Sequence, residues 1–206
     1  MADGKDITIG LLPAMQRRIN KALNLSMMLV KNEHTINIVK KPLSEITKED
    51  VGLYGCFLNE VPVLIPPMGS EPLWTILNDV TYVAPDGTVI EIEAGSKTDL
   101  ASTPNIVKVI FGGPGKETVG ALIHDEGYKH PAQERYNIFL KVLCIPKKSW
   151  WDHVFKLLMK MCCTNKIKVY VFHWAVYLFG WMSWWRNHPK DDDDKDTTIR
   201  MAPRFA

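Results

Sequence analysis

The stretch that decides the fold reads Thr98-Asp-Leu-Ala-Ser-Thr-Pro104 and then, after a glycine-rich turn at residues 112–115, Ala121-Leu-Ile-His-Asp-Glu-Gly-Tyr128. The second motif predicts a helix over residues 117–129, which the turn enters. The first motif, rich in small polar residues and ending at a proline, predicts a loop. Nothing else in the chain comes as close to a chemical signature.

Five side chains in this stretch are candidates for one site. His124 and Tyr128 are four residues apart and share a helix face, and Asp125 lies about 100° from His124 around the helix. Asp99 and Ser102 stand in the preceding loop. We expect the loop and the helix to bring these groups together.

Outward from this stretch, residues 79–94 predict a β-hairpin. Val80 and Tyr82 alternate on one arm, and Ile90 and Ile92 alternate on the other. Pro85-Asp86-Gly87 supplies the turn. Helical spacing predicts further helices at residues 132–143, 149–163 and 167–186. The fold class is therefore α+β, a small antiparallel sheet or hairpin packed against several helices.

At these residues the chain resembles the DUF1353 family, small proteins of unknown function common in bacteriophages and prophages. The resemblance covers roughly residues 72–186 and implies a DUF1353-like domain over residues 71–188. Residues 1–70 are then an N-terminal arm and irregular linker, and residues 189–206 a charged extended tail. The motifs that carry the resemblance are Trp74, Pro85-Asp86-Gly87, Thr98–Pro104, Ala121–Tyr128 and Phe179-Gly180-Trp181.

The chain departs from the family pattern after the His-Asp helix. The family has an Ala-Asp pair three residues before a phenylalanine. Counting back from Phe139 places Arg135-Tyr136 there, and a shift of one residue gives Asn137, so neither alignment has an acid. We therefore expect no orienting acid on the helix that follows, and the His-Asp site to be degenerate.

Two chemistries remain open. In one, His124 is a general base that activates water and is oriented by a carboxylate such as Asp99, while Asp125 and glycine carbonyls hold calcium. A His-Asp-x-x-Tyr helix after a glycine turn is similar to the arrangement in phospholipase A2. In the other, His124, Asp125 and Asp99 bind zinc, which polarises water. Ser102 and Tyr128 are further catalytic candidates.

Two interpretations without chemistry also remain open. Asp99 can cap a turn, and His124 and Asp125 can hydrogen-bond the loop and fix it against the helix. The cluster would then be a structural network, which we favour, or it would bind a ligand without transforming it.

Composition excludes some classes. A chain of 206 residues with 46% hydrophobic residues can bury a core. The net charge of +2 predicts no specific nucleic-acid partner. The four cysteines show no Cys-x-x-Cys spacing, so a zinc ribbon is not predicted.

The C-terminal helix is strongly aromatic. The segment Ile167–Trp185 is almost long enough to span a bilayer, but Lys168 and His173 argue against a clean span. Its tryptophan-rich end could contact a membrane interface. Because the family carries a similar ending, we favour a buried helix.

The two ends of the chain carry no chemical motif. Residues 12–30 have the spacing of an amphipathic helix, and the tail at residues 190–206 begins with a charge run. We expect both ends to contact other chains and not their own domain.

Together these patterns favour a non-enzymatic function. They predict a bacteriophage virion protein of the tail, baseplate or head-tail region, made in the host cytoplasm and forming an oligomer with other phage structural proteins. The alternative is a phage-encoded hydrolase, directed at peptidoglycan or lipid, that uses His124, Asp125 and Asp99 with a bound calcium or zinc ion.

Overall fold

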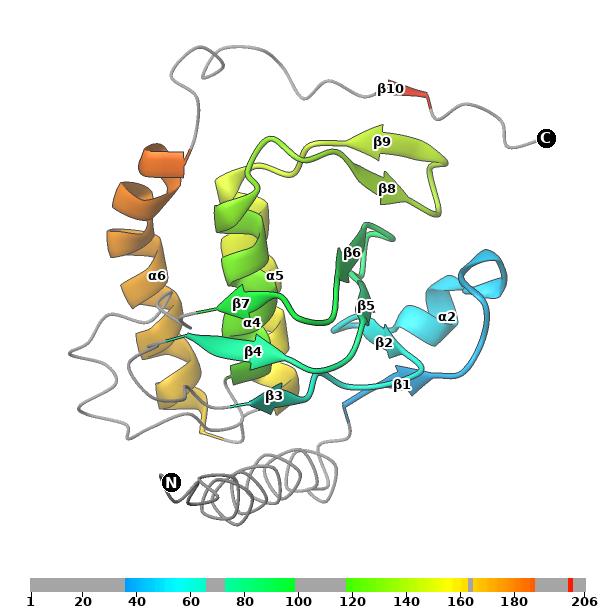
Figure 1. Cartoon of the computed structure of the whole chain (residues 1–206), viewed down its shortest axis with the longest axis horizontal. Coiled ribbons are helices and arrows are strands. Elements are labelled where there is room, and N and C mark those ends of the chain that lie inside the picture. Colours follow the sequence, from blue (N-terminus) through cyan, green and yellow to red (C-terminus); the bar gives the residue numbers. More distant parts are fainter. Residues whose placement is uncertain (1–35, 66–72, 99–117, 163–164, 188–199, 202–206) are drawn as a thin grey trace, which may run out of the picture.

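The computed structural model describes residues 36–65, 73–98, 118–162, 165–187 and 200–201. The fold is α+β, as predicted, with three long helices and three small sheets among these residues. Figure 1 shows helices α4, α5 and α6 side by side, with β2, β5 and β6 beyond α4 and α5.

The three long helices form where their apolar spacing predicts them. Helix α4 spans Thr118–Lys129, α5 spans Lys148–Cys162 and α6 spans Lys166–Asn187. Ten of the twelve residues of α4 are buried, because α5 and α6 both pack against it. The predictions of helices at 117–129, 149–163 and 167–186 are therefore confirmed.

The largest sheet has four strands in the order β1-β2-β5-β6. Strands β5 (Val80–Val83) and β6 (Val89–Ile92) form the predicted antiparallel hairpin. Its turn includes Gly87, whose φ of +89° favours glycine. Strand β2 (Cys56–Leu58) pairs antiparallel with β5, and β1 (Ile38–Val39) pairs parallel with β2.

The remaining elements are short. A second sheet has the order β3-β4-β7, and a third has the order β10-β9-β8. A capping box between Thr47 and Asp50 begins helix α2. The bounds are η1 Leu43–Glu45, α2 Lys48–Val51, β3 Leu64–Ile65, β4 Trp74–Ile76, β7 Lys97–Thr98, β8 Arg135–Asn137, β9 Val142–Cys144 and β10 Arg200–Met201.

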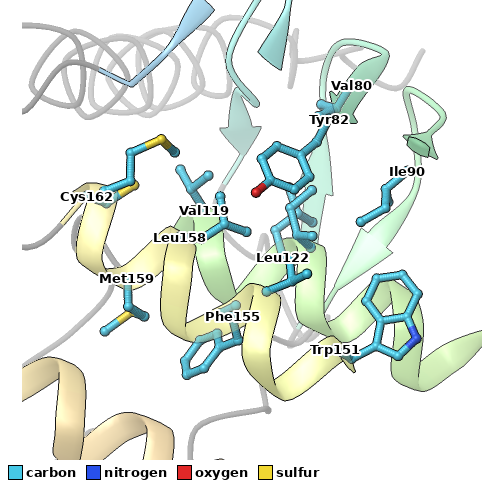
Figure 2. Packing of buried hydrophobic residues seen from close by; sticks show 14 of the residues in the cluster. Val80, Tyr82, Ile90, Val119, Leu122, Trp151, Phe155, Leu158, Met159 and Cys162 are labelled. Atoms are coloured by element: carbon cyan, nitrogen blue, oxygen red, sulfur yellow. The ribbon is translucent and has the colours of Figure 1, made fainter. Parts of the chain in front are cut away.

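The main core lies between the hairpin and the helices. In Figure 2, side chains of the hairpin approach Leu122 of α4, and Phe155 and Leu158 extend from the neighbouring α5. Tyr82 and Phe155 are completely buried. The prediction that the hairpin packs against several helices is therefore confirmed.

The predicted helix at 132–143 is wrong, because this segment forms the β8–β9 hairpin. Asn137 explains the difference. Its amide donates to the carbonyl oxygen of Asp86, and its side-chain oxygen accepts from the backbone N–H groups of Phe139 and Leu140. These contacts fix the turn between β8 and β9 and hold it against the β5–β6 hairpin. The bond to Asp86 is long-range, so local helical spacing does not reveal it.

The flanking segments also differ from expectation. The irregular linker predicted within residues 1–70 contains β2, which is buried in the main sheet and includes the fully enclosed Phe57. Strand β10 of the tail pairs with β9 of the same chain, so this part of the tail contacts its own domain. The helix predicted at 12–30 lies outside the described residues.

Helix α6 is not the buried helix we favoured. Only five of its 22 residues are buried, since it packs on α4 and α5 along one side alone. Within the described part of the chain, no helix is long and apolar enough to cross a membrane.

Candidate active site

Helix α4 carries His124 into its interface with α5. The imidazole has an exposed fraction of 1%. Its ring centroid lies 4.0 Å from that of Tyr128, one turn along α4, and 5.2 Å from that of Phe155 on α5. The predicted sharing of one helix face by His124 and Tyr128 is therefore realised as a direct ring contact.

A carboxylate from α5 meets this face. The Asp152 Oδ1 atom lies 3.0 Å from His124 Nε2 and accepts a hydrogen bond of 2.7 Å from the Tyr128 hydroxyl. The other carboxylate oxygen, Oδ2, accepts a bond of 2.6 Å from Lys148 Nζ, one turn earlier on α5. Asp152 is itself buried, so three side chains satisfy a carboxylate that is removed from water.

These donors decide the charge of Asp152. Burial alone raises the pKa of its carboxyl group, but the hydrogen bonds from His124, Lys148 and Tyr128 outweigh burial and lower the pKa below its ordinary value. The same arrangement raises the pKa of the Tyr128 hydroxyl, chiefly through burial and then through the nearby charge of Asp152. Asp152 is therefore an anion at neutral pH, and Tyr128 keeps its proton.

The charge of Asp152 also fixes the tautomer of His124. Burial lowers the pKa of the imidazole below its ordinary value, although Asp152 acts in the opposite direction, so the ring is neutral at pH 7. A carboxylate can only accept, so Nε2 carries the proton. The lone pair is then on Nδ1, which is buried and has no hydrogen-bond partner among the residues described.

Asp125 makes a hydrogen bond on another side of α4. Its Oδ2 atom accepts a bond of 2.6 Å from the hydroxyl of Thr98, at the end of β7. Asp125 and Thr98 line a cavity of about 160 Å³, next to a larger cavity of about 550 Å³ that shares Glu126, Lys129 and His130 with it. The ring of His124 lines neither cavity, because it points to Asp152 and Phe155 of α5.

The predicted loop residues cannot be placed. Asp99, Ser102 and the glycine turn at 112–115 lie outside the described residues. Among the residues that are described, no group of three histidine, cysteine, aspartate or glutamate side chains could hold a metal ion. The structure therefore brings together His124 and Tyr128 of the predicted set, and it places the side chain of Asp125 on a different side of α4.

The sequence interpretation missed Asp152. The expected position of the acid, just before Phe139, holds Arg135, which pairs with Glu126 at 2.9 Å. The carboxylate beside His124 comes instead from α5, the next helix that the structure shows. The available signal was position: on a helical wheel Asp152 falls about 20° from Met159, two turns later, at the edge of the apolar face of α5, where an unpaired charge would be costly.

Comparison with known proteins gives one match. A family model described as a protein of unknown function (DUF1353) matches residues 74–176, which include α4, α5 and the first half of α6. No curated protein and no solved structure matches the chain. Because the family model covers half of the 206 residues, the chain belongs to the DUF1353 family.

Proposed function

We propose that this protein is a hydrolase in which His124 activates water for attack on an ester bond. One observation carries the proposal. His124 is held by a buried carboxylate through Nε2, while its other nitrogen, Nδ1, is buried, unprotonated and without a partner among the described residues.

This arrangement is unfavourable for a purely structural histidine. A buried polar atom without a partner costs about 1–3 kcal/mol, and most buried groups in folded proteins avoid that cost. A general base needs such an atom, because Nδ1 must keep its lone pair free until water arrives. The network around Asp152 supports this state, since it fixes the tautomer and the orientation of the ring.

The reaction follows from that tautomer. Water binds at Nδ1 and attacks the ester carbonyl carbon while His124 takes its proton. The tetrahedral intermediate then collapses with cleavage of the bond between the carbonyl carbon and the ester oxygen, and the imidazolium returns the proton to the leaving alcohol. Asp152 stabilises the transient imidazolium across the bond of 3.0 Å.

Substrate must reach a nitrogen that protein encloses in this structure. Both cavities described above lie on the Asp125 side of α4, so a productive complex requires an opening beside the His124 ring. The virion function predicted from the sequence stays a prediction. A hydrolase carried in a phage particle would be consistent with both the virion prediction and the hydrolase proposal.

The test is a series of ester hydrolysis assays on the purified full-length protein with short-chain p-nitrophenyl esters and with long-chain lipid esters. His124→Gln keeps a donor for Asp152 but removes the base, so hydrolysis should fall by about 10²–10⁴-fold with the fold intact. His153→Gln is the matched control, because His153 follows Asp152 in the sequence but is exposed. It should keep full activity.

Asp152→Asn provides a second test. Lys148 needs an acceptor, so the new amide oxygen faces Lys148 and the amide nitrogen faces His124. Nε2 must then accept, which moves the ring proton to Nδ1 and removes the base. A wild-type protein that hydrolyses neither class of ester would contradict the proposal, as would a His124→Gln protein with unchanged activity.

A further inference from the structure

Helix α6 is apolar on two opposite sides. One side packs against α4 and α5, and the other faces solvent. Of the thirteen large hydrophobic side chains that are exposed in the described part of the chain, ten belong to α6. They are Ile167, Tyr170, Val171, Trp174, Tyr177, Leu178, Phe179, Trp181, Met182 and Trp185.

Nine of the ten, all except Phe179, form one stripe. At about 100° per residue they fall within an arc of roughly 140° that runs the length of the helix. Trp174, Trp181 and Trp185 are exposed by 55%, 49% and 62%. We call these nine residues the aromatic stripe. An apolar surface of this extent on a folded protein marks a binding site.

Positive charge borders the stripe on both sides. Lys168 and Arg186 lie about 100° to one side of its centre, and Lys166 lies about as far to the other. Helix α6 contains no acidic residue. From α5, Lys156 places Nζ 5.6 Å from the ring centroid of Tyr170, within the stripe. The charge around the stripe is therefore complementary to an anionic surface.

The same helix packs directly against the candidate site. Trp184 lies edge-on to Tyr128, with ring centroids 5.3 Å apart. Gly180 lets the helix approach, because a Cβ atom there would be 2.6 Å from the Tyr128 hydroxyl. Lys148, which donates to Asp152, also places Nζ 5.8 Å from the ring centroid of Tyr177 in the stripe. The stripe and the His124–Asp152 pair are thus two sides of one layer.

We propose that the aromatic stripe binds the surface of an anionic lipid bilayer. Tryptophan and tyrosine rings favour the boundary between headgroups and acyl chains, and a helix lying in that plane has an apolar face bordered by cations. Bound in this way, the protein would hold the His124–Asp152 pair one helix away from the bilayer surface, so ester-linked membrane lipids are the substrate class that we infer. That choice of substrate rests on the hydrolase proposal, whereas the binding does not.

Binding is measured by sedimentation of the full-length protein with vesicles of equal parts phosphatidylglycerol and phosphatidylcholine. The protein carries His124→Gln, so that lipid hydrolysis cannot alter the vesicles. We expect it to sediment with these vesicles and to partition far less onto pure phosphatidylcholine. The acidic run at residues 191–194 follows α6 in the sequence and would be repelled by anionic lipid. Stronger partitioning onto the anionic vesicles would show that the attraction of the basic residues beside the stripe exceeds this repulsion.

Three sets of substitutions locate the surface. Replacing Trp174, Trp181 and Trp185 together by serine should weaken partitioning on the order of 100-fold. Lys166→Gln with Arg186→Gln should weaken it on the order of tenfold on anionic vesicles alone. Replacing Leu53, Leu77 and Leu140 by serine is the matched control, because these side chains are exposed outside α6. It should leave partitioning unchanged.

Three results would overturn the proposal. The first is a protein that fails to sediment with anionic vesicles, and the second is a triple tryptophan variant that sediments as well as its parent. The third is a dimer, seen by light scattering, that the tryptophan substitutions dissociate while vesicles bind neither form, since a second copy then covers the stripe. Vesicle binding by the His124→Gln protein, together with no ester hydrolysis by the wild type, would support this proposal and contradict only the hydrolase.

Discussion

The Nε2 atom of His124 and the Oδ1 atom of Asp152 lie 3.0 Å apart across the interface of α4 and α5, 28 residues apart in the chain. The geometry of this contact depends on how the two helices pack. Helices α4 and α5 share the apolar core, so the same packing that buries Leu122 and Phe155 sets the distance between the imidazole and the carboxylate. Changes at this interface should therefore alter both stability and the state of His124.

Tyr128→Phe removes one of the two donors to Oδ1 of Asp152 and leaves the aromatic packing in place. Hydrogen bonds to charged groups contribute about 1.5–3 kcal/mol, so the free energy of unfolding should fall by about that much. The pKa of Asp152 should rise, because a bond that lowers it is lost. Urea unfolding measures the first effect, and carboxyl chemical shifts in a pH titration measure the second.

Tyr170→Phe is the control for this experiment, because Tyr170 is half exposed on α6. Its unfolding midpoint should match that of the wild type. If Tyr128→Phe also matches the wild type, its hydroxyl does not stabilise the Asp152 anion, and the network described here would lose one of its members.

Acid should destabilise the protein through His124. Burial lowers the pKa of His124 below its ordinary value of 6.5. As pH falls below about 6.5, the unfolded chain binds a proton that the folded chain does not yet accept. The free energy of unfolding should therefore decrease, by up to about 1.4 kcal/mol per pH unit, until the pH reaches the lowered pKa of the folded state.

Two charged groups near the ring also influence the pKa of His124. Asp152 favours the imidazolium, and Lys148 opposes it. His173 on α6 also has a lowered pKa, mainly through burial, and adds a loss in the same direction. Urea unfolding at about pH 7.5 and about pH 5 should show a smaller difference for His124→Gln than for the wild type. Equal differences would mean that His124 titrates normally in the folded protein.

Much of the fold follows from local sequence patterns. The parts that do not follow from such patterns share one cause. The hairpin around Gly87 and helices α4, α5 and α6 show their periodicity within one segment. The β8–β9 hairpin shows no such local periodicity, because Arg135 and Asn137 are held by Glu126 and Asp86, which lie outside this segment.

The candidate site is also only partly predictable from the sequence. His124 and Tyr128 could be paired from their spacing on one helix. Asp152 could not be paired with them, because its partners depend on how α5 crosses α4, which is a property of the tertiary structure. The exposed side of α6 was also missed, since an apolar sequence does not say which of its sides a neighbour covers.

The pair Arg135–Glu126 should stabilise the β8–β9 hairpin against α4. The Arg135 side chain is only 4% exposed, and its bond to Glu126 is 2.9 Å long. Glu126→Ala would leave a buried guanidinium without its carboxylate and should cost about 3–5 kcal/mol. Thermal unfolding measures this loss. Lys41→Ala, which breaks the more exposed pair with Asp50, should cost much less because solvent screens that pair.

A small loss for Glu126→Ala, similar to that for Lys41→Ala, would contradict this account of the hairpin. It would mean that water or another side chain hydrogen-bonds the Arg135 guanidinium in place of Glu126. Arg135 also stacks on Trp151, with its guanidinium carbon 5.8 Å from the ring centroid, and that contact would then hold the strand.

Two glycines on α4 should respond very differently to the same substitution. Gly127 packs directly under the indole of Trp151, which is 1% exposed, and a Cβ atom there would overlap the ring. At Gly120, a Cβ atom would lie 3.4 Å from the nearest atom of Phe155, a tight but tolerable contact. Gly127→Ala should therefore cost about 3 kcal/mol, whereas Gly120→Ala should be nearly neutral, since alanine favours a helix by about 1 kcal/mol.

Gly127→Ala should also reduce ester hydrolysis, because moving Trp151 displaces its neighbour Asp152 from His124. Thermal unfolding and hydrolysis assays on the two variants, run side by side, separate the effects. Gly120→Ala changes the same helix without touching Trp151, so its activity should equal that of the wild type. If Gly127→Ala were as stable and as active as Gly120→Ala, α4 and α5 would not be packed at the distance on which the His124–Asp152 pair depends.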